Sequence, residues 1–279
     1  MVTPLDGQRM KDRQGAPVLV VGAHRSGTSA TARALEILGL QIGQCLDSHR
    51  EPRSLQQLHE EYLRRVGAAW HEPTPFLEWV RTPEGERDCT DYLCNHVRRE
   101  FASIFGYRNN PKGFWLRARL KLGMPWGWKE PRTTLFASSW LERFPNARIV
   151  HVIRHPLSAA VSIRQRELSF RAAGDPPTGK IDSLDYCLSL VLTYVEAGER
   201  LASLTPRYRR VRFEDIQANP AKALDDLANL CGLHFTTTQM AAAIASIRPE
   251  SFPPWRDVSK ETARELLSRH PIVTKLGYE

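Results

Sequence analysis

Hydrophobic positions follow two different periods along the 279 residues, and stretches of the two kinds alternate along the chain. Short runs of consecutive apolar residues predict buried strands, whereas apolar residues three and four positions apart predict helices. The predicted strands are 18–21, 126–129, 149–153 and 210–213. The predicted helices are 28–38, 54–67, 89–106, 134–143, 157–170, 184–204, 221–231, 237–245 and 259–269.

Strands that alternate with long helices are typical of an α/β fold in which helices cover both faces of a parallel sheet. Residues 73–87 and 171–180 contain several prolines and interrupt the alternation, so both segments predict loops. Such loops are often lids or substrate-binding elements, but an ordinary surface excursion fits each equally well. Neither is typical of a domain boundary. We therefore expect one domain over 1–279, with a flexible segment 1–16 and a helical C-terminal part 234–279.

A glycine-rich turn joins the first predicted strand to the first predicted helix. Gly22 and Gly27 enclose four residues, and Thr28 and Ser29 then open the helix. The backbone N–H groups of such a turn and the positive end of the helix dipole face one anion. The ATP-hydrolysing version ends in Gly-Lys-Ser/Thr, whereas here Thr28 replaces the lysine and Arg25 supplies a cation inside the loop. The pattern predicts a phosphate site, although an ordinary strand-to-helix turn would share it.

The chain carries 39 Lys and Arg against 31 Asp and Glu, a formal net charge of +8. This charge suits an anionic ligand, although solvated faces give many proteins such an excess. No basic run is long enough for a nucleic-acid-binding arm. The five cysteines include no Cys-x-x-Cys pair, which argues against a disulfide framework or zinc site and favours a reduced, cytoplasmic compartment. No apolar run approaches the roughly 20 residues of a membrane-spanning helix, so we expect no transmembrane segment.

Charged residues also follow the other predicted strands. Lys129 ends the strand 126–129, and Arg154 follows 149–153, with Ser162 eight residues later on the next helix. Ligands of doubly wound sheets bind beyond the carboxyl ends of the strands. A guanidinium with a serine hydroxyl suits a phosphate monoester, unless Arg154 only pairs structurally. Glu214 and Asp215 follow the last strand. They fit either a magnesium site or, as we favour, the orientation of a neighbouring loop arginine.

Four motifs in this order resemble the sulfotransferases that use 3′-phosphoadenosine 5′-phosphosulfate (PAPS), most of all the bacterial sulfotransferase-family proteins. The motifs are Gly-x-x-Arg-Ser-Gly-Thr-Ser, Trp-Lys-Glu-Pro-Arg, Val-Ile-Arg-His-Pro-x-x-x-x-x-Ser and Arg-Phe-Glu-Asp-Ile. Each is weak alone, but together they are specific, and the resemblance covers about 17–233. It implies a P-loop NTPase-like three-layer α/β sandwich, with a central, mostly parallel sheet flanked by helices.

The resemblance also implies roles for individual residues. Arg154 and Ser162 match the residues that hold the 3′-phosphate of PAPS. Lys129 matches a lysine that lies beside the transferred group in the protein-tyrosine branch, and it would act there with Arg25. No metal is expected, because fixed cations and amides suffice for a sulfuryl group. The loop residues that match the 5′-phosphosulfate site are Arg25, Ser26, Gly27, Thr28 and Ser29.

The general base is expected in the segment 47–52, where the protein-tyrosine branch has its catalytic glutamate. We place Glu51 ahead of His49, although a polar loop without chemistry would also fit this segment. Glu130 and His155 are weaker candidates, because the adjacent prolines indicate turns. A base of this kind contributes about 10²–10⁴-fold to the rate.

The chain departs from the cytosolic branch of the family near its C-terminus. That branch grips the 3′-phosphate with a glycine-rich Arg-Lys-Gly segment, which is absent from this sequence. Arg256, Lys260 and the tail 274–278 are alternative sources of the contact. Trp70, Trp79, Trp115 and Trp126 fit an acceptor pocket or, more commonly, core packing, and Lys112 lies in a turn that fits either an acceptor contact or a surface loop.

The sequence therefore predicts in-line transfer of a sulfuryl group from PAPS to a hydroxyl or amine of a glycan, lipid, natural product or peptide. Two alternatives remain. A P-loop small-molecule kinase would bind ATP with magnesium, and the missing loop lysine argues against it. A non-catalytic nucleotide-binding protein would keep the donor site without turnover.

Overall fold

A five-stranded parallel sheet forms the centre of the computed structural model, which describes residues 16–43, 46–104, 123–248, 255 and 258–278. The strand order is β2-β3-β1-β4-β5, and every neighbouring pair is parallel. The sheet confirms the predicted fold class and the four predicted strands, although the strand predicted at 210–213 spans 208–212 instead. The strands are β1 Val18–Val21, β2 Gln41–Ile42, β3 Trp126–Lys129, β4 Arg148–Ile153 and β5 Tyr208–Arg212.

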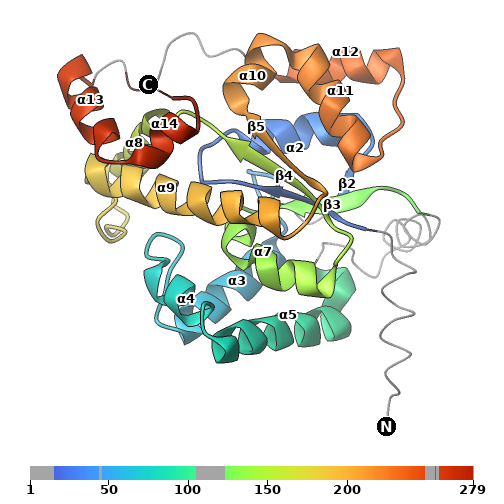
Figure 1. The fold of residues 1–279 in the computed structure, drawn as a ribbon, viewed down its shortest axis with the longest axis horizontal. Helices are drawn as coiled ribbons and strands as arrows, with labels where there is room; N and C mark the ends of the chain where they lie inside the picture. The colour runs from blue at the N-terminus through green and yellow to red at the C-terminus, as the bar shows by residue number, and fades with distance from the viewer. Residues whose placement is uncertain (1–15, 44–45, 105–122, 249–254, 256–257, 279) are drawn as a thin grey trace.

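Helices cover both faces of the sheet, as Figure 1 shows. The predicted helices are confirmed to within a few residues, except that the one predicted from 89 begins at 83. None of the helices within the described residues is long and apolar enough to cross a membrane. The helices are α2 Thr28–Ile37, α3 Arg53–Arg65, α4 Thr74–Trp79, α5 Pro83–Ile104, α7 Thr133–Arg143, α8 Pro156–Ala172, α9 Leu184–Arg200, α10 Phe213–Ala218, α11 Pro220–Cys231, α12 Thr237–Ser246, α13 Lys260–Ser268 and α14 Pro271–Lys275.

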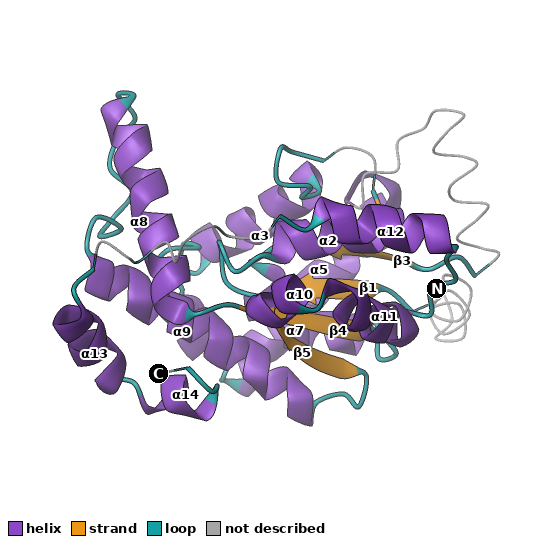
Figure 2. Cartoon of the chain, turned by 90° about the horizontal axis from the view of Figure 1, so that it is seen from above, coloured by secondary structure: helices purple, strands orange, loops and turns teal. Residues whose placement is uncertain are grey.

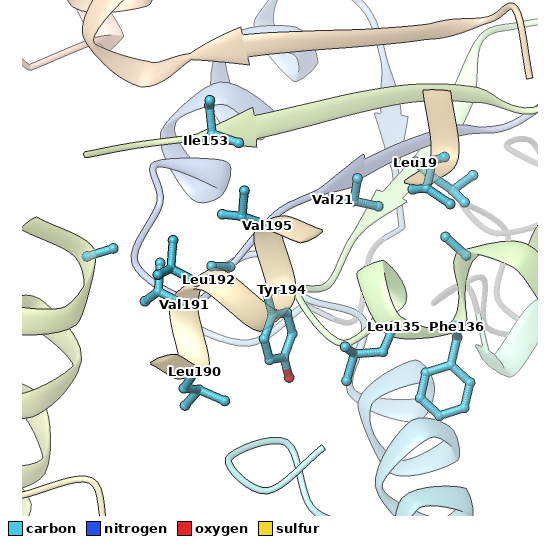
Figure 3. Close-up of a cluster of buried hydrophobic side chains, with 14 of the residues drawn as sticks. Leu19, Val21, Leu135, Phe136, Ile153, Leu190, Val191, Leu192, Tyr194 and Val195 are labelled. Carbon is cyan, nitrogen blue, oxygen red and sulfur yellow. The ribbon is translucent and has the colours of Figure 1, made fainter. Parts of the chain in front are cut away.

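Alternate residues of the strands enter two separate cores. In β1, Leu19 and Val21 pack with α7 and α9, and Figure 3 shows these side chains beside Tyr194 and Phe136. Val18 and Val20 point to the opposite face, where α2, α11 and α12 cover them. Because side chains alternate across a strand, a continuous apolar run is what a strand buried on both faces requires.

The loop predicted at 73–87 is wrong, because this segment contains α4 and the start of α5. Pro73 precedes α4 as its N-cap, and the other two prolines lie in first helical turns, where the missing N–H costs nothing and the fixed φ favours the helix. Pro75 lies at the start of α4 and Pro83 begins α5. The other predicted loop is confirmed, since no helix or strand lies between Ala172 and Leu184. Segment 1–15 lies outside the described residues.

Parallel pairing brings the ends of β1, β3 and β4 to one edge of the sheet. Val20 pairs with Lys129 at the end of β3, and Val21 pairs with His151 in β4. The glycine loop after β1, the turn after β3 and the turn before α8 therefore lie next to each other. From this edge α8 projects beyond the other helices (Figure 2).

Candidate active site

The loop between β1 and α2 has a backbone that glycine makes possible. Gly27 has φ 92°, and a Cβ there would lie 2.3 Å from the ring of Phe213. Gly22 donates its N–H to Thr134 Oγ1 at 2.8 Å, which anchors the loop to α7. Ser26 is buried, and its hydroxyl donates to Ala23 O at 2.7 Å. The Ser26 side chain therefore stabilises the loop from inside.

The first turn of α2 is open to an anion. Its N-cap is Gly27, no side chain caps it, and the turn contains no acidic residue. Helix N-termini leave backbone N–H groups without intrahelical partners, and these groups bind phosphate or sulfate. Thr28 and Ser29 begin the helix here, in the position that the sequence predicted for the anion site.

Arg25, Arg154 and Ser162 lie together on one side of this loop. Arg25 Nε donates to Ser162 Oγ at 2.9 Å, and Arg154 Nη1 donates to Arg25 O at 3.0 Å. Arg154 is 8% exposed. Burial and the charge of Arg154 lower the pKa of Arg25. Two guanidinium groups and a hydroxyl thus converge where an anion would relieve their repulsion.

Lys129 and Glu51 lie on the other side of the loop. Lys129 is fully buried, and its Nζ donates to Glu51 Oε1 at 2.6 Å and to Ser29 Oγ at 3.1 Å. Gln56 Nε2 donates to the other Glu51 oxygen at 2.6 Å. Burial raises the pKa of Glu51 despite the opposing charge of Lys129, and the nearby Glu130 raises it further. Glu51 is therefore a buried carboxylate with a raised pKa beside the start of α2.

His49 contributes its backbone more than its ring. Its carbonyl accepts a hydrogen bond from Ser29 Oγ at 3.2 Å, and its N–H donates to Asp47 Oδ1 at 2.8 Å. The same Asp47 oxygen accepts from Glu51 N at 2.9 Å, so Asp47 fixes the turn that carries Glu51. Burial is the main cause that lowers the pKa of His49. The residue as a whole remains exposed at the mouth of the site.

One cavity of about 480 Å³ joins these groups. Its lining includes five predicted features: Arg25, the start of α2, His49, Glu51 and Arg154. Two further predicted residues lie behind the lining, where Lys129 bonds Glu51 and Ser162 bonds Arg25. Among the described residues, no cluster of three His, Cys, Asp or Glu side chains is arranged to hold a metal ion. The lining residues that the sequence did not single out are His24, Gln56, Pro131, Arg132, Arg166, Glu167, Phe170 and Thr178.

The sequence contained patterns that could have identified Arg166 and Arg132 as residues of the site. Arg166 follows Ser162 by four residues and so lies on the same face of α8. Arg132 belongs to the same motif as Lys129. Trp70 also lines the cavity, but nothing in its neighbourhood along the chain distinguishes it from Trp79, which lines a different pocket, or Trp126, which is fully buried.

The weaker base candidates have structural contacts. Glu130 is fully buried and binds Arg132 Nη1 at 2.6 Å and His59 Nδ1 at 2.7 Å. The His155 ring stacks on Trp255 with ring centroids 5.2 Å apart. The backbone N–H of His155 donates to Glu214 Oε1 at 2.7 Å. Glu214 thus orients the backbone beside Arg154. Both candidates match the turn-forming roles that their prolines indicated.

The C-terminal segment lies beside the Arg154 turn. Tyr278 contacts the His155 ring at 5.2 Å, and Lys260 lines a second cavity that also contacts His155. Neither residue lines the cavity of Glu51 and Arg154. Arg256, Lys112 and Trp115 lie outside the described residues.

A glycine loop before an uncapped helix, with cations from two neighbouring strand ends, defines a P-loop-like α/β protein. A model of the sulfotransferase family matches residues 17–237, and the chain belongs to this family. Sulfotransferase STF9 from Mycobacterium avium has the same fold, with 13% identity, a TM-score of 0.52, and 98% of this chain and 79% of that one covered. The sulfotransferase domain from the curacin biosynthetic pathway is 14% identical and has a TM-score of 0.50. The match covers 96% of this chain and 99% of that domain. No curated protein matches the sequence.

Proposed function

We propose that the protein transfers a sulfuryl group from PAPS to a hydroxyl or amine of a small-molecule, glycan, lipid or peptide acceptor, in the cytoplasm. The observation that carries the proposal is the convergence of two charged groups of side chains on one loop. Lys129 bridges Glu51 and Ser29 on one side, and Arg25 bridges Ser162 and the Arg154 guanidinium on the other. Family membership supports the transferase chemistry.

Two anion sites fit the donor better than they fit ATP. The uncapped start of α2 suits the 5′-phosphosulfate, and Arg154 with Ser162 suits the 3′-phosphate. ATP carries no 3′-phosphate and would leave the second site without a ligand. This difference argues against the kinase alternative.

In the proposed reaction the acceptor oxygen attacks sulfur while the bond from sulfur to the 5′-phosphate oxygen breaks. Glu51 takes the acceptor proton, and adenosine 3′,5′-bisphosphate leaves. A base works best with a pKa near the working pH, and burial moves the pKa of Glu51 in that direction. Lys129, Arg25 and the loop amides stabilise the charge that develops on the transferred and leaving oxygens. These fixed cations act without a metal ion.

Isothermal titration with adenosine 3′,5′-bisphosphate, followed by transfer of labelled sulfate from PAPS to an acceptor panel, tests the proposal. We expect tight binding without magnesium, much weaker binding of ATP, and transfer to at least one acceptor. Absence of bisphosphate binding would contradict the proposal. Magnesium-dependent ATP binding would favour a kinase, and bisphosphate binding without turnover on any acceptor would favour the non-catalytic alternative.

A further inference from the structure

Arg166 lies in the cavity one helical turn after Ser162, at the end away from the strand edge. Four residues along a helix correspond to about 6 Å. Its guanidinium carbon lies 5.4 Å from the centre of the Trp70 ring and 6.0 Å from that of Phe170. Both rings line the same cavity, and Phe170 is 48% exposed. This end of the cavity therefore combines a cation with an aromatic wall.

Arg166 has no ion pair and no hydrogen bond to any part of the chain that the structure describes, and its guanidinium lies beside the two aromatic rings. The carboxylates that line the cavity nearby are already engaged. Glu167 accepts hydrogen bonds from Arg171 and from Thr178 N, and Glu51 accepts from Lys129 and Gln56. Burial and the charge of Arg25 lower the pKa of Arg166. A half-buried guanidinium without an anion is one that a ligand can neutralise.

A further ring of the cavity lining packs against Trp70. His24 packs against the Trp70 ring with centroids 4.5 Å apart. Burial, together with the charge of Arg132, holds the pKa of His24 well below its usual range. The Trp70 and Phe170 rings thus border Arg166, and His24 adds to this aromatic surface through its contact with Trp70, which suits a ring more than a second phosphate.

We propose that Arg166, between Trp70 and Phe170, binds a carboxylate carried by a ring-containing, hydroxylated acceptor. The proposal rests on the proposed function and names its acceptor class. A guanidinium stacked on a ring keeps its N–H edge free for a bidentate contact with a carboxylate. Glu51 and Arg166 line the same cavity, so one acceptor can place its carboxylate at the cation and its hydroxyl at the base.

The donor accounts less well for Arg166. The two anion sites assigned to PAPS lie at the start of α2 and at Arg154 with Ser162, and none of the hydrogen bonds that arrange them involves Arg166. Substitution of Arg166 should therefore leave donor affinity unchanged, which separates an acceptor contact from a donor contact.

The test uses three phenolic acids with different reach: 4-hydroxybenzoate, 4-hydroxyphenylacetate and 3-(4-hydroxyphenyl)propanoate, each paired with its methyl ester. Arg166→Met removes the charge and keeps an apolar stem against Trp70, and Arg166→Lys keeps only the charge. Arg33→Met, at an exposed position on α2, is the charge-matched control. Affinity is measured by calorimetry with saturating adenosine 3′,5′-bisphosphate, and turnover is measured with PAPS.

We expect the unaltered protein to bind at least one acid about 10- to 100-fold more tightly than its ester. Arg166→Met should remove this preference and leave ester and bisphosphate affinity unchanged, while Arg166→Lys should retain part of it. The absence of an acid preference in all three pairs, or an equal loss for acid and ester, overturns the proposal. A loss of bisphosphate affinity in Arg166→Met also overturns it. Failure of the unaltered protein to bind bisphosphate would instead reject the proposed function.

Discussion

Arg154 is the buried guanidinium on which the proposed 3′-phosphate site depends. It is 8% exposed, and its hydrogen bond to Arg25 O directs it toward the glycine loop. A charged hydrogen bond contributes about 1.5–3 kcal/mol. Arg154→Ala should therefore weaken binding of adenosine 3′,5′-bisphosphate by about 10- to 150-fold in calorimetry. Arg33→Ala, which removes the same charge from an exposed position, should have no effect. Unchanged affinity in Arg154→Ala would remove Arg154 from the donor site.

Glu51 is the residue on which proton transfer depends in the proposed reaction. Glu51→Gln preserves the size of the side chain and an oxygen for Lys129 but removes the base. We expect kcat for sulfate transfer to fall by about 10²–10⁴-fold, with bisphosphate affinity unchanged. Glu61→Gln, at an exposed position on α3, is the control. Full activity in Glu51→Gln would transfer the role of base to His49 or another group.

The pH profile gives a second measurement on the same residue. Burial raises the pKa of Glu51. The kcat of the unaltered protein should therefore begin to fall, as the pH is lowered, at a pH above the pKa of an ordinary glutamate. The free carboxylate is the active form, and protonation removes it as the pH falls through this raised pKa. The residual activity of Glu51→Gln should lack this acid limb. An acid limb that persists in the variant would belong to a different group.

At the scale of elements, the turn between β3 and α7 is fixed by a buried ionic network. Glu130 accepts hydrogen bonds from Arg132 Nη1, from His59 on α3 and from Thr133 N. Trp140 Nε1 donates to His59 Nε2 at 3.0 Å, which leaves His59 Nδ1 to donate to Glu130. The network joins α3 to the start of α7 directly after Lys129. The network therefore fixes the backbone that follows Lys129.

Glu130→Gln should destabilise the fold, because it leaves Arg132 buried with a weaker partner. Removing one partner of a buried pair costs about 3–5 kcal/mol of unfolding free energy. Burial opposes ionisation of Glu130, but Arg132 and His59 lower its pKa below the ordinary value. The ionised Glu130 therefore contributes its full stabilisation at pH values above about 4.3, the pKa of glutamate in an unfolded chain. This contribution is lost as the pH falls from there toward the lower pKa of the folded state. Urea unfolding at pH 7 and below pH 4 measures the difference, with the exposed Glu142→Gln as control. A difference that stays constant with pH would contradict the ionic origin.

The sequence predicted those elements whose pattern reflects their own burial. Apolar runs identified β1 and β4 because strands covered on both faces have no polar side. It missed the two-residue β2, the six-residue α10, and α4, whose prolines start a helix instead of ending one. It also predicted the residues at the strand ends, because parallel topology alone brings these together. The contact between Trp70 and Arg166 joins α8 to the segment after α3, and no local pattern encodes such a tertiary contact.

At the scale of the whole molecule, the C-terminal segment returns to the edge of the sheet that carries Arg154. In Figure 1 the red helices α13 and α14 lie beside α8 and α9. Tyr278 OH donates to Glu214 Oε2 at 3.0 Å, and Arg212 lies 4.3 Å from the Tyr278 ring centre. The second Glu214 oxygen holds His155 N. Residues beyond the family match at 17–237 thus support the turn on which Arg154 depends.

Tyr278→Phe should therefore affect donor binding from outside the cavity. Loss of the hydroxyl removes one hydrogen bond to a carboxylate, which lowers the free energy of unfolding by about 1.5 kcal/mol. Because Glu214 then loses a partner beside His155, we expect the bisphosphate Kd to rise threefold to tenfold, about 0.7–1.4 kcal/mol. Tyr62→Phe is the control, since that hydroxyl donates to the Asp88 carboxylate and accepts from Trp79, and none of these residues lines the cavity. It should lower stability in urea unfolding but leave the Kd unchanged. An equal change of Kd in both variants would indicate general loosening of the fold, and an unchanged Kd in Tyr278→Phe would show that the C-terminal segment does not orient Arg154.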